Sequence, residues 1–203
     1  MIPTRLGARP AVECSSVMPA HTSPFDACGP TVGIRRALPS DAEEFVALAG
    51  SSRAFVHPWI TLPPDADLAE KYARRLRLES NFSVFVCEAS SGRMVGVINL
   101  SEIVRGVLQS AYLGFWIGAP FARRGYMREG LRLLIRHAFD TMRLHRLEAN
   151  IQPANTASLA LVRACGFLRE GYSPKYLHIG GEWRDHERWA IRADDDGTAG
   201  PRA

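Results

Sequence analysis

YLGFWIGAPFARRGYM, residues 112–127, joins a short apolar run to a basic turn and the start of a long amphipathic pattern. The run YLGFWI predicts a buried strand, and a Gly-Ala-Pro break ends it. Arg123-Arg124-Gly125 then stands directly before the predicted helix. Unpaired backbone N–H groups and the positive end of the helix dipole meet at such a turn, and both favour an anion. We therefore expect this strand–turn–helix to bind a phosphorylated ligand.

The usual nucleotide fingerprints are missing from this turn. The chain contains no G-x-G-x-x-G, which a dinucleotide fold would carry, and no G-x-x-x-x-G-K-[ST], which a Walker loop would carry. An ordinary turn with surface arginines remains an alternative explanation for the same residues.

Length and composition predict one globular domain. The chain has 203 residues, of which 46% are hydrophobic and 23% charged. Its net charge of +4 suits an anionic cofactor, but no basic run interleaved with aromatic residues predicts nucleic-acid binding. No apolar run approaches the roughly 20 residues of a membrane span, and the N-terminus has no apolar signal-peptide core. We therefore expect a cytoplasmic protein without a membrane partner.

The four cysteines, Cys14, Cys28, Cys87 and Cys165, form no C-x-x-C pair. Their spacing predicts neither a disulfide framework nor a metal site, so we expect free thiols.

The pattern along the chain divides it into three parts. Residues 1–30 predict a mobile leader, residues 31–192 a folded domain, and residues 193–203 a flexible tail. Strands are expected at 31–38, 82–89, 93–103, 112–117 and about 146–152, followed by a hairpin that turns at Gly180-Gly181. Helices are expected from Ser40, with a capping box to Glu43, and at 67–80, after Gly125 and from Asn155. This order predicts a mixed α/β (α+β) sheet in a single domain, flanked by helices.

Further motifs give the turn a family context. Ala122–Met127 matches the pattern Q/R-x-x-G-x-G/A at Gly125, while Ala122 and Met127 depart from it. Other segments occur in order: HPW (57–59), INLSEIVRG (98–106), YLGF (112–115), HRLEAN (145–150), PANTAS (153–158), GFLREGY (166–172) and GEWRDH (181–186). Together they resemble the GNAT N-acetyltransferases, specifically the ribosomal-protein-alanine (RimJ/RimL) group and most closely its RimJ branch. The resemblance covers roughly residues 31–192.

The resemblance implies a mostly antiparallel sheet that splays between its fourth strand, 112–117, and its fifth, about 146–152. Acetyl-CoA would lie in the opening, with its pantetheine amides against the backbone of Phe115, Trp116 and Ile117. The pyrophosphate would be held by the backbone of Arg123, Arg124, Gly125, Tyr126, Met127 and Arg128. No metal is implied.

Asn155 and Ser158 form an N-x-x-S pattern at a predicted helix start, where Asn155 would be an ordinary N-cap. The resemblance adds two roles: Asn155 would contact the cofactor, and Ser158 would protonate the departing thiolate.

The sequence offers several candidate residues for removing the proton of the amine and for binding the acceptor. An α-amino group has a pKa near 8, so a modest base is sufficient. Glu102 is the first candidate, with Glu148 and Glu170 behind it, although each could be a surface carboxylate. His57 and Trp59, in the short HPW motif, and Arg105, after a strand, are candidates for binding the acceptor.

The resemblance implies that acetyl is transferred from acetyl-CoA to the N-terminal α-amino group of a ribosomal protein. We expect this transfer to be direct, because Cys87 and Cys165 have no evident His partner for an acyl-enzyme route. Two alternatives stay open: the same fold acting on a small-molecule amine, and a non-catalytic CoA-binding module. A homodimer is also left open.

Overall fold

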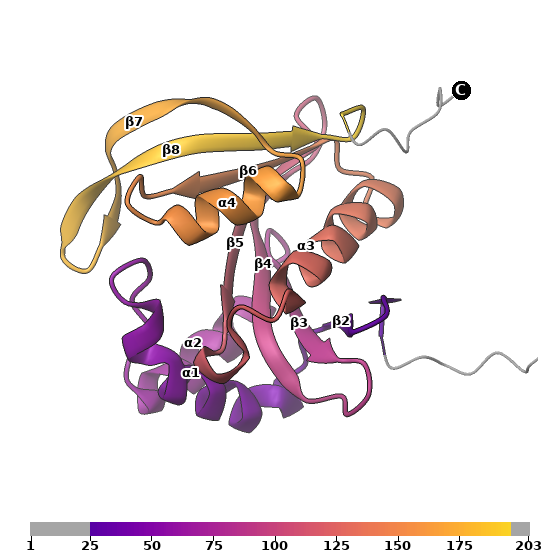
Figure 1. Cartoon of the computed structure of the whole chain (residues 1–203), viewed down its shortest axis with the longest axis vertical. Coiled ribbons are helices and arrows are strands. Elements are labelled where there is room, and N and C mark those ends of the chain that lie inside the picture. The colour runs from indigo at the N-terminus through magenta and orange to yellow at the C-terminus, as the bar shows by residue number, and fades with distance from the viewer. Residues whose placement is uncertain (1–24, 196–203) are drawn as a thin grey trace, which may run out of the picture.

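The computed structural model describes residues 25–195, which form one eight-stranded sheet with helices on both faces (Figure 1). The strands are β1 (Ala27–Cys28), β2 (Val32–Arg36), β3 (Phe82–Glu88), β4 (Met94–Val104), β5 (Ser110–Ile117), β6 (Arg146–Ile151), β7 (Leu168–Ile179) and β8 (Glu182–Arg192). The helices are α1 (Ala42–Val56), α2 (Asp65–Leu76), α3 (Tyr126–Arg136) and α4 (Thr156–Ala164). Short 3₁₀ turns precede α1 and α3, and a π-helical turn (His137–Thr141) extends α3. The predicted α/β class and single domain are confirmed.

The strand order is β1-β2-β3-β4-β5-β6-β8-β7, and β5–β6 is the parallel pair in an otherwise antiparallel sheet. This pair is short, because Ser110–Tyr112 pairs with Arg146–Glu148 and the pairing then stops. Beyond Tyr112 the two strands diverge, although β5 continues to Ile117 and β6 to Ile151. The expected splay between these strands is therefore present.

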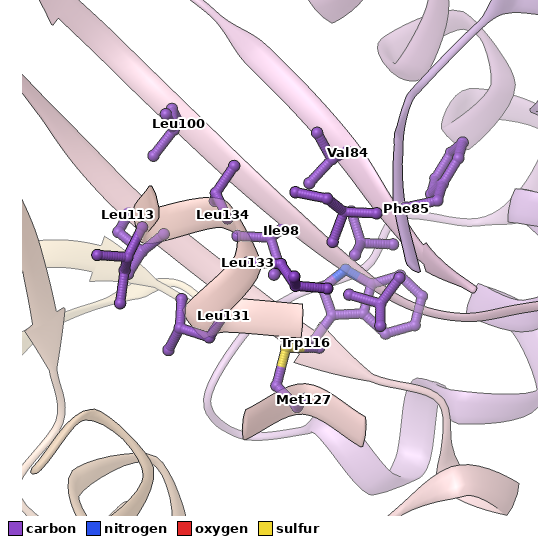
Figure 2. Packing of buried hydrophobic residues seen from close by; sticks show 14 of the residues in the cluster. Val84, Phe85, Ile98, Leu100, Leu113, Trp116, Met127, Leu131, Leu133 and Leu134 are labelled. Atoms are coloured by element: carbon purple, nitrogen blue, oxygen red, sulfur yellow. The ribbon is translucent and has the colours of Figure 1, made fainter. Parts of the chain in front are cut away.

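Each face of β5 packs against different helices. Phe45 of α1 contacts Trp116 and Phe85, with ring centroids 6.2 and 6.1 Å apart. Tyr72 of α2 stacks on Phe85 at 6.0 Å, so α1 and α2 cover one face. On the other face, Leu131 and Leu134 of α3 belong to the same buried cluster as the sheet residues Ile98, Leu100 and Leu113 (Figure 2). Removing such side chains from water supplies the main stabilisation of the layers.

The first turn of α3 lies close to the sheet because of one glycine. A Cβ atom placed on Gly96 would lie 2.7 Å from Cε of Met127 and 2.9 Å from the backbone oxygen of Trp116, so a larger residue would force these neighbours to shift. Met127 is 7% exposed and packs in the core. Its departure from the Gly/Ala pattern is therefore accommodated by the absence of a side chain on the neighbouring strand.

Several boundaries differ from expectation. The predicted capping box from Ser40 to Glu43 is wrong: α1 begins at Ala42 with no side-chain cap, and the Asp41 carboxylate accepts from the Leu38 N–H at 2.7 Å instead. At the N-terminus, Ala27–Cys28 already pairs with β2, inside the expected leader. The remainder of that leader, residues 1–24, lies outside the described residues, as do residues 196–203 of the expected tail.

Within the described chain, no helix is long and apolar enough to cross a bilayer.

Candidate active site

A cavity of about 850 Å³ fills the opening between the diverging strands. Its walls come from the end of α1 and the following loop, the bulged end of β4, β5, the turn before α3, the end of β6, the start of α4 and the β7–β8 hairpin. Among the predicted site residues, the walls contain Trp59, Glu102, Phe115, Trp116, Ile117, Arg123, Arg124, Gly125, Tyr126, Met127, Arg128, Asn155 and Ser158.

Two predicted acceptor residues lie outside these walls. Arg105 donates through Nη1 to the carbonyl of Met142 at 2.6 Å, which directs it to the turn after α3. His57 is the exposed C-cap residue of α1. The neighbouring Trp59 does line the cavity, and its carbonyl accepts from Nε2 of Gln152 at 3.2 Å, which connects the α1–α2 loop to the end of β6.

The turn before α3 has the geometry of an anion site. Gly125 is the N-cap of α3, with φ of +82°, and no side chain among residues 25–195 caps this helix. The N–H groups of the first helical turn therefore lack intrahelical partners. Arg123, Arg124 and Arg128 surround this turn and form no ion pair with a carboxylate of the described residues. The positive side chains and the positive end of the helix dipole thus both attract an anion to this turn.

Helix α1 fixes the chain just upstream of this turn. The buried hydroxyl of Ser52 accepts from the Ala119 N–H at 3.0 Å. A Cβ atom on Gly118 would lie 2.5 Å from Leu48, so the strand end also packs tightly on α1. The turn is therefore held between α1 and the sheet.

The edge of β5 offers backbone groups to the cavity at alternate residues. The Gly118 N–H donates to Val95 of β4, and the Gln109 carbonyl accepts from Arg146 of β6. Because successive residues of a strand point their N–H and C=O groups to opposite neighbours, Phe115 and Ile117 face the opening. The backbone groups of Trp116 face β4, while its side chain lines the cavity, so its predicted backbone contact with the cofactor stays a prediction.

At the start of α4, the Asn155 side chain accepts from the backbone N–H of Ser158 at 3.1 Å. Asn155 is therefore an N-cap, as its residue type predicts. Both residues line the cavity, so the cap also presents the Asn155 amide and the Ser158 hydroxyl there.

The three candidate bases differ in their surroundings. Glu148 and Glu170 both pair with Arg146, with N···O distances of 2.9 Å, and the hydrogen bond from Arg146 lowers the pKa of Glu170. Glu102 forms no such ion pair within the described chain and lines the cavity. It stands at the β4 bulge with φ of +49°, a conformation that costs a non-glycine residue about 1–2 kcal/mol.

Two cavity residues, Tyr176 and His186, were not among the predicted site residues. The interaction with the side chain of Tyr176, together with burial, raises the pKa of Tyr112 to about 12. His186 is 2% exposed, and its Nδ1 lies 2.9 Å from the carbonyl of Arg184. Nδ1 is therefore the donor and Nε2 the acceptor, and burial lowers the pKa of His186. The GEWRDH segment contains this histidine, but sequence patterning could not show that it faces the opening.

Asn150 of β6 was also missed. Its Oδ1 atom is buried without a hydrogen-bond partner in the described chain, and the residue lines the cavity. A buried amide oxygen without a partner is costly, so this atom is suited to accept from an N–H of a bound molecule.

The cysteines of the described chain do not line the cavity. Cys87 and Cys165 are buried, and burial raises the pKa of both, that of Cys87 to about 11. Neither has the depressed pKa of a nucleophilic cysteine.

Comparison with known proteins agrees with this geometry. The sequence model of the acetyltransferase (GNAT) domain family matches residues 31–168. The probable N-acetyltransferase YjcK of Bacillus subtilis is 31% identical over 176 residues, covering 83% of this chain and 97% of that protein. The [ribosomal protein uS5]-alanine N-acetyltransferase of Escherichia coli is 32% identical over 163 residues, covering 76% and 84%.

Similar folds have been solved. RimJ of Mycobacterium smegmatis in complex with CoA-disulfide superimposes with a TM-score of 0.73 at 26% identity, covering 82% of this chain and 87% of that one. A more distant relative, spermidine N(1)-acetyltransferase of Vibrio cholerae, is 23% identical over 158 residues, covering 77% and 90%. From the matched domain, the splayed sheet and these relatives, the chain belongs to the GNAT acetyltransferase family.

Proposed function

We propose that this acetyltransferase acts in the cytoplasm on the N-terminal α-amino group of a ribosomal protein, with alanine as the first residue. The observation that carries the proposal is the opening between β5 and β6, which has an uncapped helix N-terminus at one end and Trp59, Glu102 and Tyr176 among its other wall residues. The similarity to a uS5-alanine N-acetyltransferase, at 32% identity over most of both chains, favours this acceptor. Residues 31–192 would form the catalytic domain and residues 193–203 its tail.

The residues present fit acetyl-CoA, which supplies an activated acetyl thioester when bound. Phe115 and Ile117 have outward-facing backbone groups that suit an extended chain of amides, and the Asn150 oxygen needs a donor. The N–H groups at the start of α3, with Arg123, Arg124 and Arg128 nearby, suit the pyrophosphate. Asn155 would add a contact from α4.

In the proposed mechanism, the amine attacks the acetyl group directly, and residues of the chain transfer protons and stabilise the charge that develops. Glu102 would take the proton of the incoming amine, directly or through water. The free N–H of Phe115 or Ile117 would stabilise negative charge that develops on the carbonyl oxygen. Ser158 would return a proton to the leaving thiolate. His57 and Arg105, which lie outside the cavity walls, could contact only parts of an acceptor beyond the opening.

Direct transfer predicts that no cysteine becomes acetylated. Cys87→Ala and Cys165→Ala should each retain kcat within about twofold, because both thiols are buried and have a raised pKa. Steady-state kinetics and intact-mass measurement test this expectation. A variant that lost turnover, with an acetyl-thioester trapped in the wild type, would contradict the direct mechanism.

The acceptor is tested with peptides and amines in parallel. Peptides that begin with Ala or Ser, the same peptides with a blocked N-terminus, and spermidine would be incubated with acetyl-CoA, and product mass would be measured. The proposal expects acetylation of the free Ala peptide at its α-amino group. Acetylation of spermidine alone would support the small-amine alternative, which the Vibrio cholerae relative favours. Binding of acetyl-CoA without turnover on any amine would support a non-catalytic module.

A further inference from the structure

A second cavity, of about 320 Å³, lies between the sheet and the helices α1 and α2. It shares Ile60, Gly114, Phe115 and Trp116 with the larger cavity, so the two spaces meet at the middle of β5. Gly114 leaves this junction open, because a Cβ atom built there would have no heavy atom within 4 Å. A molecule with its reactive group at β5 could therefore extend into the second cavity.

One wall of the second cavity carries the positive charge of Arg75. Arg75 of α2 donates from Nε to the Ser83 hydroxyl at 3.2 Å, and Nη2 lies 3.5 Å from the carbonyl of Leu100. Arg75 forms no ion pair with a carboxylate of the described chain. Burial lowers the pKa of Arg75, opposed by the charge of Glu102. A half-buried guanidinium that forms no ion pair is suited to bind an anion.

The Arg75 side chain is also oriented in advance. The Ser83 hydroxyl, itself 6% exposed, donates to Oδ1 of Asn99 at 2.7 Å while it accepts from Arg75. This chain of hydrogen bonds holds Nε toward the sheet and leaves Nη1 without a hydrogen-bond partner in the described chain. A guanidinium held in this way presents donors at a fixed angle, which favours a planar carboxylate.

The rest of the lining strengthens this preference. Lys71 lies one turn before Arg75 on the same face of α2 and also lines the cavity. Most of the other walls are apolar or aromatic, including Phe45, Phe85 and Trp116. Low polarity around Arg75 increases its attraction for an anion, and the exposed Lys71 adds a second positive charge, so a cationic group is unfavourable there.

We propose that the second cavity is a subsite for a carboxylate of the acceptor, held by Arg75 and Lys71. The inference rests on the proposed function, in which the acceptor is a protein N-terminus, and it narrows that acceptor to one with an acidic side chain close to the reacting amine. A polyamine would bring positive charge to the same wall and is disfavoured.

Matched acceptors test the subsite. Peptides with Ala first and Glu, Gln or Lys second would be compared by kcat/KM at saturating acetyl-CoA. A smaller pair, β-alanine and its amide, carries the same amine with and without a carboxylate. The wild type should prefer Glu to Gln by about tenfold, which corresponds to about 1.4 kcal/mol, and disfavour Lys, because only Glu offers a charge-assisted hydrogen bond.

Variants assign the preference to the named side chains. Arg75→Met should abolish the preference for Glu and leave the KM for acetyl-CoA unchanged, and Arg75→Lys should restore part of it. Lys71→Met changes an exposed residue and should weaken the preference without affecting folding. Arg74→Met, on the neighbouring exposed position of α2, is the matched control and should have no effect.

The outcomes separate the two proposals. Equal use of Glu and Gln peptides, or a preference that survives both Arg75→Met and Lys71→Met, overturns the subsite while leaving N-terminal acetylation in place. If no peptide is acetylated but β-alanine is preferred to its amide, the subsite stands and the ribosomal acceptor falls. If neither the peptides nor the small amines show a carboxylate preference, the subsite is rejected.

Discussion

Gly125 determines how the backbone turns into α3, because its φ of +82° lies in the left-handed region. An alanine there would meet no atom within 4 Å, so the cost is conformational, about 1–2 kcal/mol, rather than steric. To relieve this strain, the turn would rotate the first N–H groups of α3 away from the pyrophosphate position. We expect Gly125→Ala to raise the KM for acetyl-CoA about tenfold or more, and Gly125→Val to raise it further, with little change in the KM for the acceptor.

Gly92 provides the control for this experiment. It lies in the β3–β4 turn with φ of +72°, and a Cβ atom there also meets nothing within 4 Å. Gly92→Ala should therefore lower the free energy of unfolding by a similar amount and leave both KM values unchanged. Equal effects of Gly125→Ala on the two KM values would argue against a phosphate-binding turn.

His186 predicts how stability depends on pH. Because burial lowers its pKa in the folded state, the unfolded chain takes up this proton first as the pH falls. The contribution of neutral His186 to the free energy of unfolding is complete above its pKa in the unfolded chain, about 6.5, and is lost as the pH drops below that value. His186→Gln should flatten the pH dependence of the free energy of unfolding between about pH 7.5 and 5, as measured by denaturant titration.

The same substitution should cost about 1–3 kcal/mol at neutral pH, because it disturbs a buried hydrogen bond. His178, an exposed histidine of β7, supplies the control, and His178→Gln should leave the pH profile as it is in the wild type. An unchanged slope in His186→Gln would show that another group titrates in this range.

At the scale of elements, α4 combines a structural cap with a predicted ligand contact. Asn155→Ala removes the side-chain acceptor for the Ser158 N–H and should lower the free energy of unfolding by about 1 kcal/mol. Asn155→Ser should restore the cap, since serine is an equally good N-cap. If Asn155 also binds acetyl-CoA, the serine variant will recover stability in thermal melts but keep a raised KM. If Asn155→Ser recovers both the stability and the wild-type KM for acetyl-CoA, Asn155 acts only as a helix cap.

The elements also differ in how far they could be predicted. The strand at 112–117, the following helix and the Gly180-Gly181 hairpin were predicted correctly, because apolar spacing and glycines are local signals. The cap of α1 was predicted incorrectly, since Asp41 rather than Ser40 makes the hydrogen bond that organises the turn. The strand β1 was missed because two residues carry no periodicity and gain their order from pairing with β2.

For the whole molecule, ligand binding in the opening should stabilise the fold. The cavity walls come from elements between α1 and β8, so a bound molecule connects parts of the chain that are distant in sequence. Acetyl-CoA at about 100 times its Kd should add about 2.7 kcal/mol, which raises the Tm by roughly 5–10 °C for a chain of this size. Differential scanning fluorimetry measures this shift.

Acetyl-pantetheine is the matched ligand, since it lacks the pyrophosphate and the nucleotide. Compared at equal concentrations, it should give a clearly smaller shift in Tm. Similar shifts for the two compounds would mean that the turn at α3 contributes little to binding.

Local sequence was sufficient for the strand–turn–helix to which we assign phosphate binding, because a strand, a left-handed glycine and an amphipathic helix are encoded within residues 112–127. The motifs at similar intervals then indicated the family, and with it the splayed sheet. These features depend on residues close together in the chain, or on their order along it.

Tertiary packing decided the rest. The backbone N–H and C=O groups of Phe115, rather than those of Trp116, face the opening. The reason is that β4 pairs with one edge of β5, while β6 leaves the other edge after Tyr112. His186, Tyr176 and Asn150 reach the cavity from strands whose order in the sheet differs from their order in the sequence. Arg75 lines the second cavity because α2 packs on the sheet, whereas Arg105 turns toward the carbonyl of Met142. Such directions arise from contacts between distant segments, which residue spacing does not encode.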